Sequence, residues 1–295
     1  MAEIPETIDV ESIIGSFNKI SIEGSPISYI TRKINGEELK FVSVLMAETL
    51  LLGRYLRYFN PDIFCHCISV KGYYITDAEA KVLNYINVQC SSTMNGNHEF
   101  IAGKDCIVRL EDVQEFHTFL NVCYNKMESN INDQEIQFEK QFGYIRFESY
   151  VIPYFTKEGE KYLPLLFFEK TTDDLLLGAM ELKNWDLAYL KFCCHIMGVY
   201  DDLYNFDFCT VVRFNNLKNY FPPDTIFEEF WPKNLFFDSS IINYSEHLHE
   251  PNFWITEYLG SSIMSQESLT ANNANQVQIN HSEPNSLIKH SHSKQ

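Results

Sequence analysis

Two short clusters of cysteine and histidine are the residues of this sequence that come nearest to a metal site or a reactive thiol. They occupy residues 64–67 (Phe-Cys-His-Cys) and residues 192–195 (Phe-Cys-Cys-His). Zinc needs several thiolate or imidazole ligands that converge in a tetrahedron. The first cluster is spaced too tightly for a chelating loop, and donors at successive helix positions in the second point about 100° apart. We therefore expect core cysteines and no metal or cofactor, with a zinc- or thiol-dependent enzyme as an alternative.

Other sequence patterns that would indicate a reaction are absent. The chain has no Gly-x-Ser-x-Gly elbow, no cysteine beside a glycine-rich turn and neither glycine fingerprint for nucleotide phosphates. The acidic pairs Asp173-Asp174 and Asp201-Asp202 lack the alternating ligand spacing of a calcium loop. We interpret them as loop or helix-start charges, and the sequence favours a non-enzymatic protein.

Five residues are candidates for contacts with a protein partner. Arg109 and Arg213 each follow a valine at the end of an expected strand, where either could face a partner or pair with a nearby acid. Phe227, Phe230 and Trp231 lie in an aromatic and acidic stretch. Aromatic side chains dominate interface hot spots. The same spacing also suits a segment that covers its own core, and this second interpretation is favoured.

The elements that position these residues are expected to occur twice. Residues 106–116 (CIVRLEDVQEF) are echoed about a hundred residues later by residues 209–220 (CTVVRFNNLKNY). Each copy predicts a short buried strand and a helix with an aliphatic and an aromatic residue on one face. Upstream, Asn35-Gly36 and Glu158-Gly159 predict hairpin turns, because such turns need positive φ. The repeat predicts an α+β fold of two tandem small modules, each a β-hairpin plus helices and a short third strand.

The composition divides the chain into five expected segments. Residues 1–24 are acidic and predict a flexible lead with one short helical stretch. Residues 25–127 and 143–236 would form the two modules, joined by a polar linker over residues 128–142. Residues 237–295 would form a mostly extended or disordered tail, because the end of the chain holds few apolar residues. Apolar spacing predicts helices over residues 10–17, 46–59, 76–88, 112–127, 185–197 and 216–221.

Charge and cysteine content restrict the function further. The 295 residues carry a formal charge of −17, which disfavours binding to phosphate backbones. Direct nucleic-acid binding through the first module, for instance at Arg54 and Arg57, is kept as an alternative. We expect neither a signal peptide nor a membrane segment. Eight cysteines, several of them within apolar runs, predict a reduced intracellular protein.

The order of the predicted elements resembles the domain shared by the Ski, Sno and Dachshund proteins. Residues 155–164 (FTKEGEKYLP) are similar to the hairpin and first-helix start of that family. Residues 190–199 resemble its central helix, and residues 209–221 its closing strand and helix. The first module matches at residues 35–36, 75–88 and 106–123, and departs at residues 42–44, where Val-Ser-Val stands in place of Leu-Pro. The resemblance implies two tandem degenerate copies of this domain.

The resemblance also implies a nuclear co-regulator of transcription that binds other proteins. We therefore expect a non-enzymatic protein-protein interaction module that acts as a transcriptional co-regulator or as an adaptor in a chromatin complex. It would be nuclear, with a cytoplasmic location as the alternative. Its partners would be other regulatory proteins, and the acidic charge favours basic ones.

Overall fold

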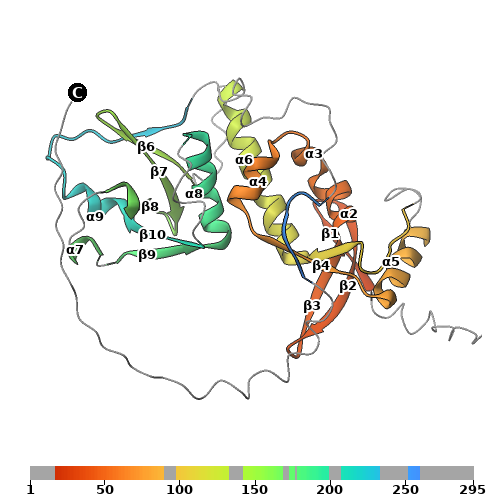
Figure 1. Cartoon of the computed structure of the whole chain (residues 1–295). Coiled ribbons are helices and arrows are strands. Elements are labelled where there is room, and N and C mark those ends of the chain that lie inside the picture. Colours follow the sequence, from red (N-terminus) through yellow and green to blue (C-terminus); the bar gives the residue numbers. More distant parts are fainter. Residues whose placement is uncertain are drawn as a thin grey trace, which may run out of the picture. The chain divides into compact units, whose positions relative to one another are not determined.

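The structure, a computed structural model, describes residues 17–89, 98–132, 142–168, 173–176, 178–198, 207–232 and 252–259. These residues form an α+β fold with two six-stranded sheets (Figure 1), which confirms the fold class predicted from the sequence. The first half of the structure, defined here as residues 17–132 with residues 252–259, contains the first sheet. The second half, residues 142–232, contains the second sheet.

The first sheet has the strand order β1-β2-β3-β5-β4-β12. Its strands are β1 (Phe17–Ile22), β2 (Ser25–Ile34), β3 (Glu37–Ser43), β5 (Cys106–Arg109), β4 (Val70–Tyr74) and β12 (Ile255–Leu259). Neighbouring strands are antiparallel except β12, which runs parallel to β4. The turn between β2 and β3 confirms the predicted hairpin, with φ of 51° at Asn35 and 84° at Gly36.

The second sheet has the strand order β11-β6-β7-β8-β10-β9 and is antiparallel throughout. Its strands are β11 (Glu228–Phe230), β6 (Phe142–Phe147), β7 (Tyr150–Lys157), β8 (Glu160–Pro164), β10 (Phe208–Arg213) and β9 (Met180–Lys183). The turn between β7 and β8 confirms the second predicted hairpin, with φ of 52° at Glu158 and 80° at Gly159.

Five strands follow the same order in both sheets. The series β6-β7-β8-β10-β9 repeats β1-β2-β3-β5-β4, including the antiparallel sense of every pair. Arg109 at the end of β5 pairs with Phe41, and Arg213 at the end of β10 pairs with Tyr162. Two copies of one module would produce this correspondence, and the tandem-copy interpretation stays a prediction.

The helices of the first half differ from the expected pattern between residues 44 and 67. They are α2 (Val44–Ala47), the π-helical turn η1 (Glu48–Leu52), α3 (Gly53–Leu56), α4 (Pro61–Cys67), α5 (Asp77–Gln89) and α6 (Leu110–Asn132). One helix over residues 46–59 was expected, but a π-helical turn interrupts it. Pro61 opens α4, because Asn60 caps it by accepting from the Asp62 N–H at 3.0 Å and proline suits the first helical turn.

Local capping signals in the sequence agree with the structure. Residues 76–79 (Thr-Asp-Ala-Glu) have the pattern of a capping box before α5, and both of its hydrogen bonds are present. The Glu79 carboxylate accepts from the Thr76 N–H at 2.8 Å, and the Thr76 hydroxyl accepts from the Glu79 N–H at 3.3 Å. The second half contains the 3-10 turn η2 (Leu165–Phe167), α7 (Asp173–Leu176), α8 (Asn184–Ile196) and α9 (Phe214–Lys218). Gly198, with φ of 70°, follows the end of α8, a position at which glycine commonly ends a helix.

Several predicted boundaries were wrong. The expected flexible lead, residues 1–24, includes β1, which pairs along its length with β2. The expected linker, residues 128–142, overlaps the last turns of α6 and the start of β6. The expected tail, residues 237–295, includes β12, which belongs to the first sheet. Of the helix expected over residues 10–17, only Phe17 is described, and it begins β1. The tail beyond residue 259 lies outside the described residues.

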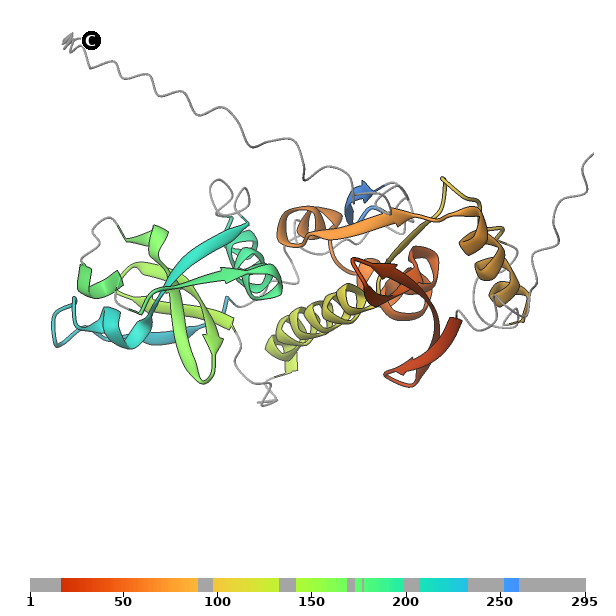
Figure 2. The same cartoon turned by 90° about the horizontal axis from the view of Figure 1, so that it is seen from below.

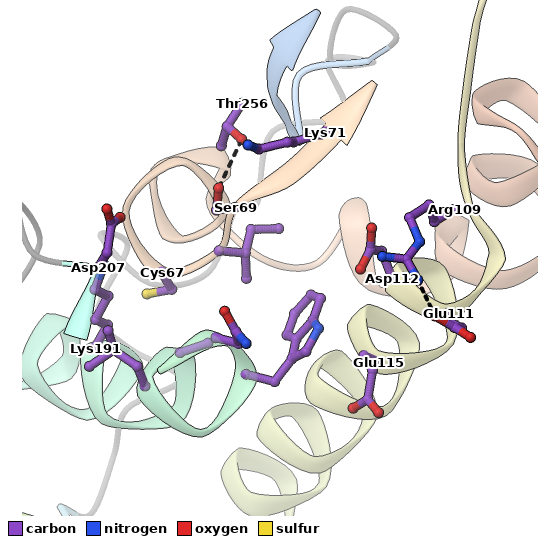
Figure 3. A pocket seen from close by; sticks show the side chains of 15 residues that line it. Cys67, Ser69, Lys71, Arg109, Glu111, Asp112, Glu115, Lys191, Asp207 and Thr256 are labelled. Atoms are coloured by element: carbon purple, nitrogen blue, oxygen red, sulfur yellow. Dashed lines mark hydrogen bonds and ion pairs between the residues drawn. The ribbon is translucent and has the colours of Figure 1, made fainter. Parts of the chain in front are cut away.

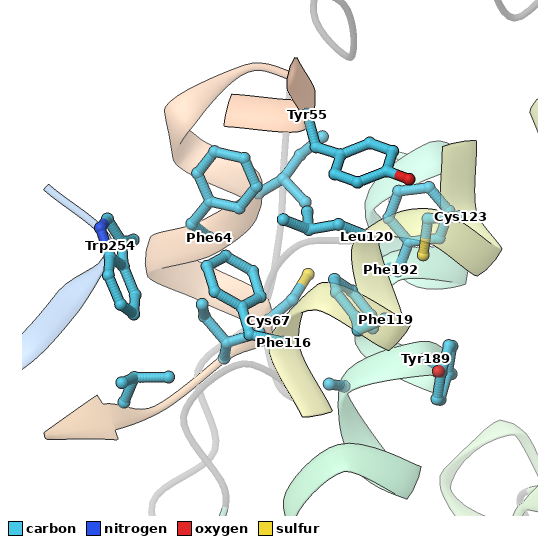
Figure 4. Packing of buried hydrophobic residues seen from close by; sticks show 14 of the residues in the cluster. Tyr55, Phe64, Cys67, Phe116, Phe119, Leu120, Cys123, Tyr189, Phe192 and Trp254 are labelled. Atoms are coloured by element: carbon cyan, nitrogen blue, oxygen red, sulfur yellow. The ribbon is translucent and has the colours of Figure 1, made fainter. Parts of the chain in front are cut away.

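Both halves share one hydrophobic core. At the contact between them, α8 of the second half lies beside α4 and α6 of the first half (Figures 1 and 2). Phe192 of α8 meets Phe119 of α6 edge to face, with ring centroids 6.0 Å apart (Figure 4). It meets Phe59 of the first half in the same way, with ring centroids 6.2 Å apart. It also meets Phe142 of β6 at 6.0 Å. The described strands and helices therefore belong to one compact unit, Met1–Ser261, rather than to two separate domains.

A half-buried carboxylate connects β12 to the first half. Glu48, the first residue of η1, accepts through one oxygen from the Trp254 indole N–H at 2.6 Å and from the Asn252 N–H at 2.8 Å. Burial raises the pKa of this carboxyl above its ordinary value of 4.5, although the two hydrogen bonds act in the opposite direction. The folded chain therefore holds a proton on Glu48 more tightly than the unfolded chain does.

The free energy of unfolding is expected to depend on pH in part because Glu48 titrates. As the pH rises from about 4.5 through the raised pKa, the folded state loses its advantage in proton binding, so this group contributes less stability at neutral than at acidic pH. Glu48→Gln removes the titration and keeps an amide oxygen as acceptor. Urea unfolding of both proteins between pH 4 and 8 should show wild type losing stability relative to the variant as the pH rises. Parallel pH profiles would contradict this account of Glu48.

Candidate functional site

A cleft of about 800 Å³ lies where the first half meets α8 (Figure 3). The end of α4, the segment that leads into β4 and the start of α6 form its walls on the side of the first half. The first turns of α8 and Asp207 line the opposite side, and Thr256 of β12 completes the lining. The cleft therefore depends on the contact between the two halves and on the position of β12.

Charged side chains of both signs line this cleft. Glu111, Asp112 and Glu115 come from the first turns of α6, where acidic residues are favoured by the helix dipole. Asp207 adds a fourth carboxylate, while Lys71, Arg109 and Lys191 supply positive charge (Figure 3). The carboxylates outnumber the cations by one.

Burial alters the acidity of two of these groups. It raises the pKa of the Asp112 carboxyl, although the charge of Arg109 acts in the opposite direction. It lowers the pKa of the Lys191 ammonium group. Both shifts arise because the charged form is poorly solvated inside the cleft. A ligand that brings a compensating charge would therefore relieve part of this cost.

Trp185 gives the cleft an aromatic surface. It lies in the first turn of α8, is half-buried, and packs against Phe116 and Phe119 of α6, with ring centroids 5.9 and 6.1 Å apart. The packing fixes the ring beside the carboxylates of α6. The sequence predicts that a helix begins at Trp185. The local sequence pattern does not predict that this side chain contacts α6, about 70 residues earlier in the chain.

The two arginines predicted as partner contacts have different surroundings. Arg109 lines the cleft, and its guanidinium forms an ion pair with Glu111. Arg213 is exposed, and its Nε donates to the Tyr162 hydroxyl at 3.4 Å. The matching strand positions of these residues therefore do not bring them together at one site.

The three aromatic residues predicted as a partner anchor pack on the second sheet. Phe227 contacts Phe147, Phe214 and Phe221. The guanidinium of Arg146 lies 3.6 Å from the ring centroid of Phe230. Trp231 packs against Phe142 and Tyr144, with ring centroids 5.8 and 5.4 Å apart. All three side chains are half-buried, and their contacts match the interpretation that this segment covers its own core.

The three described cysteines of the two clusters lie in the shared core. Cys67, Cys193 and Cys194 are buried, whereas the side chains of Cys65 and His66 are not described. Desolvation raises the pKa of the Cys194 thiol to about 12 and that of Cys67 still further. Among the described residues, no group of three or more cysteine, histidine or carboxylate side chains could hold a metal ion.

Arg54, one of the two arginines considered for nucleic-acid binding, makes a contact within the protein. The Arg54 guanidinium lies 4.8 Å from the ring centroid of Tyr124. Arg32, another cation of the first half, donates to both carboxylate oxygens of Glu79 and to the backbone carbonyl of Tyr74. At least part of the positive charge in this half therefore stabilises the fold.

Comparisons with known proteins reveal no relative: no family model, no curated protein and no solved structure matches the chain. The resemblance to the Ski, Sno and Dachshund domain stays a prediction. In the described part of the chain, every helix is too short or too polar to span a membrane.

The six described thiols are expected to be unreactive in the folded protein. Cys67, Cys106, Cys123, Cys193, Cys194 and Cys209 are all buried, and desolvation raises the pKa of each. A Cys65→Ser/Cys90→Ser variant contains these six thiols alone. Treated with an aromatic disulfide reagent at pH 7.5, it should release almost no thiolate until denaturant is added. Rapid reaction of one thiol under native conditions would contradict this.

Proposed function

We propose that this chain is a non-enzymatic interaction protein that binds a basic segment of a partner protein in the cleft beside Trp185. The observation that carries the proposal is the placement of half-buried Asp112 and exposed Glu115 on one wall of a cleft that Trp185 also lines. The proposal extends to a role as a nuclear transcriptional co-regulator or chromatin-complex adaptor, an extension supported by the sequence resemblance alone.

A lysine or arginine side chain suits the chemistry of this wall. Its charge would compensate the partly desolvated carboxylate of Asp112. The planar guanidinium of an arginine, or the aliphatic chain of a lysine, could lie along the indole of Trp185. A cation over such a ring gains about 0.5–2 kcal/mol of interaction free energy.

The character of the thiol in the cleft supports binding rather than catalysis. Cys67 is the cysteine that lines the cleft, and desolvation raises its pKa far above the ordinary value. A thiol of this kind carries almost no thiolate at neutral pH, and the thiolate is the nucleophile in cysteine chemistry. The overall charge of −17 similarly favours a basic protein over a nucleic acid as the ligand.

Reversal of one charge in the cleft is expected to weaken partner binding strongly. Glu115→Lys places a cation on an exposed position of α6, so it should leave the fold intact. Immobilised full-length protein would be used to capture partners from nuclear extract, followed by mass spectrometry. We expect proteins bound by wild type to be reduced at least tenfold on Glu115→Lys.

Glu37→Lys is the matched control for this experiment. It makes the same charge change at an exposed position of β3, beside the Asn35-Gly36 turn, and should capture the same partners as wild type. Binding of a fluorescent hexa-arginine peptide, measured at increasing salt, adds a defined probe. Equal capture and equal peptide affinity for wild type and both variants would overturn the proposal.

A further inference from the structure

Residues 252–259 dock on the first sheet as a strand that is remote in sequence from its neighbours. Among the described strand pairs, only β12 and β4 run parallel to each other. Residues 233–251 connect this segment to the second half and lie outside the described residues. A chain of this length can reach about 60 Å when extended. Its covalent connection therefore imposes little constraint on the edge at which the segment docks.

The anchor of this segment is a buried tryptophan. Trp254 is only 1% exposed, and its ring lies 5.4 Å from that of Phe116. Its indole N–H and the Asn252 N–H share one carboxylate oxygen of Glu48. Glu48 therefore fixes both a side chain and the backbone two residues before it.

Further contacts follow at alternate positions of the strand. Thr256 donates through its hydroxyl to the Val70 carbonyl at 3.1 Å. Tyr258 stacks on Tyr74, with ring centroids 5.6 Å apart and ring planes 24° apart. A backbone ladder that supplies affinity, with alternate side chains that supply specificity, is how extended peptides bind to sheet edges.

We propose that the edge of β4, together with Glu48, is a peptide-binding site whose resident ligand is the chain's own segment 252–259. The site recognises an extended strand with the pattern Asn-aromatic-Trp-aliphatic-Thr. A partner protein that carries such a strand binds by replacing the resident segment. This site is separate from the acidic wall of α6, and its test does not depend on the basic ligand proposed for the cleft.

Release of the resident segment should open the site to the same sequence supplied as a peptide. A fluorescein-labelled peptide of residues 251–260 (PNFWITEYLG) would be titrated into full-length Trp254→Ala and wild type, with binding followed by fluorescence anisotropy. We expect the variant to bind at least tenfold more tightly, because wild type is already occupied. A peptide with alanine in place of tryptophan should bind to neither protein.

Three further variants distinguish opening of the site from loss of structure. Trp254→Phe keeps an aromatic ring and removes the N–H donor to Glu48, so intermediate peptide affinity is expected. Tyr220→Ala removes an exposed aromatic side chain remote from the segment and should bind the peptide as weakly as wild type. Adding Glu48→Ala to Trp254→Ala should reduce peptide affinity at least tenfold. Failure of both Trp254 variants, with native circular dichroism, to bind the peptide would overturn the proposal.

A disulfide can show whether the resident segment belongs to the same chain. The hydroxyl oxygens of Ser69 and Thr256 lie 3.4 Å apart, so cysteines at both positions should face each other. After mild oxidation, Ser69→Cys/Thr256→Cys should run as a monomer on a non-reducing gel, with the new disulfide located by peptide mapping. A covalent dimer joined through residues 69 and 256 would contradict the assignment of the segment as a ligand in cis.

Discussion

The packing of Phe192 against aromatic rings from both halves is the interaction on which the rest of this structure depends. Phe59 and Phe119 meet it from the first half, and Phe142 meets it from the second sheet. Large buried aromatic residues contribute more to stability than most other side chains. Their contact also fixes α8 beside α6, and this placement brings Trp185 to the carboxylates that line the cleft.

The cleft and the strand-docking site are structurally connected through β12. Thr256 donates to Val70 in the strand pair and also lines the cleft. Phe116 contacts both Trp254 and Trp185, so one aromatic residue of α6 supports the resident segment and the aromatic surface of the cleft. Replacement of β12 by a partner strand would therefore change one wall of the cleft. This connection offers a physical route by which two binding events could influence each other.

Local signals in the sequence predicted the local features of the fold. Asn35-Gly36 and Glu158-Gly159 specify hairpin turns through positive φ, and Thr76 with Glu79 specifies a helix start through reciprocal hydrogen bonds. Features that depend on distant residues were missed. The pairing of β12 with β4 and the placement of Trp185 opposite α6 arise from contacts between remote segments, which periodicity and turn chemistry do not encode. Among the candidate residues, Arg109 lines the cleft, while the aromatic stretch packs on its own sheet.

Native-state hydrogen exchange of wild type and Phe192→Ala tests the shared core most directly. Removal of this fully buried ring should cost about 3–5 kcal/mol. If both sheets depend on it, the most protected amides of β3 and of β7 should lose the same free energy of opening, while Phe208→Ala, at a position 45% exposed, should change neither. Loss of protection confined to the second sheet, with β3 unchanged, would contradict a common core and the cleft built on it.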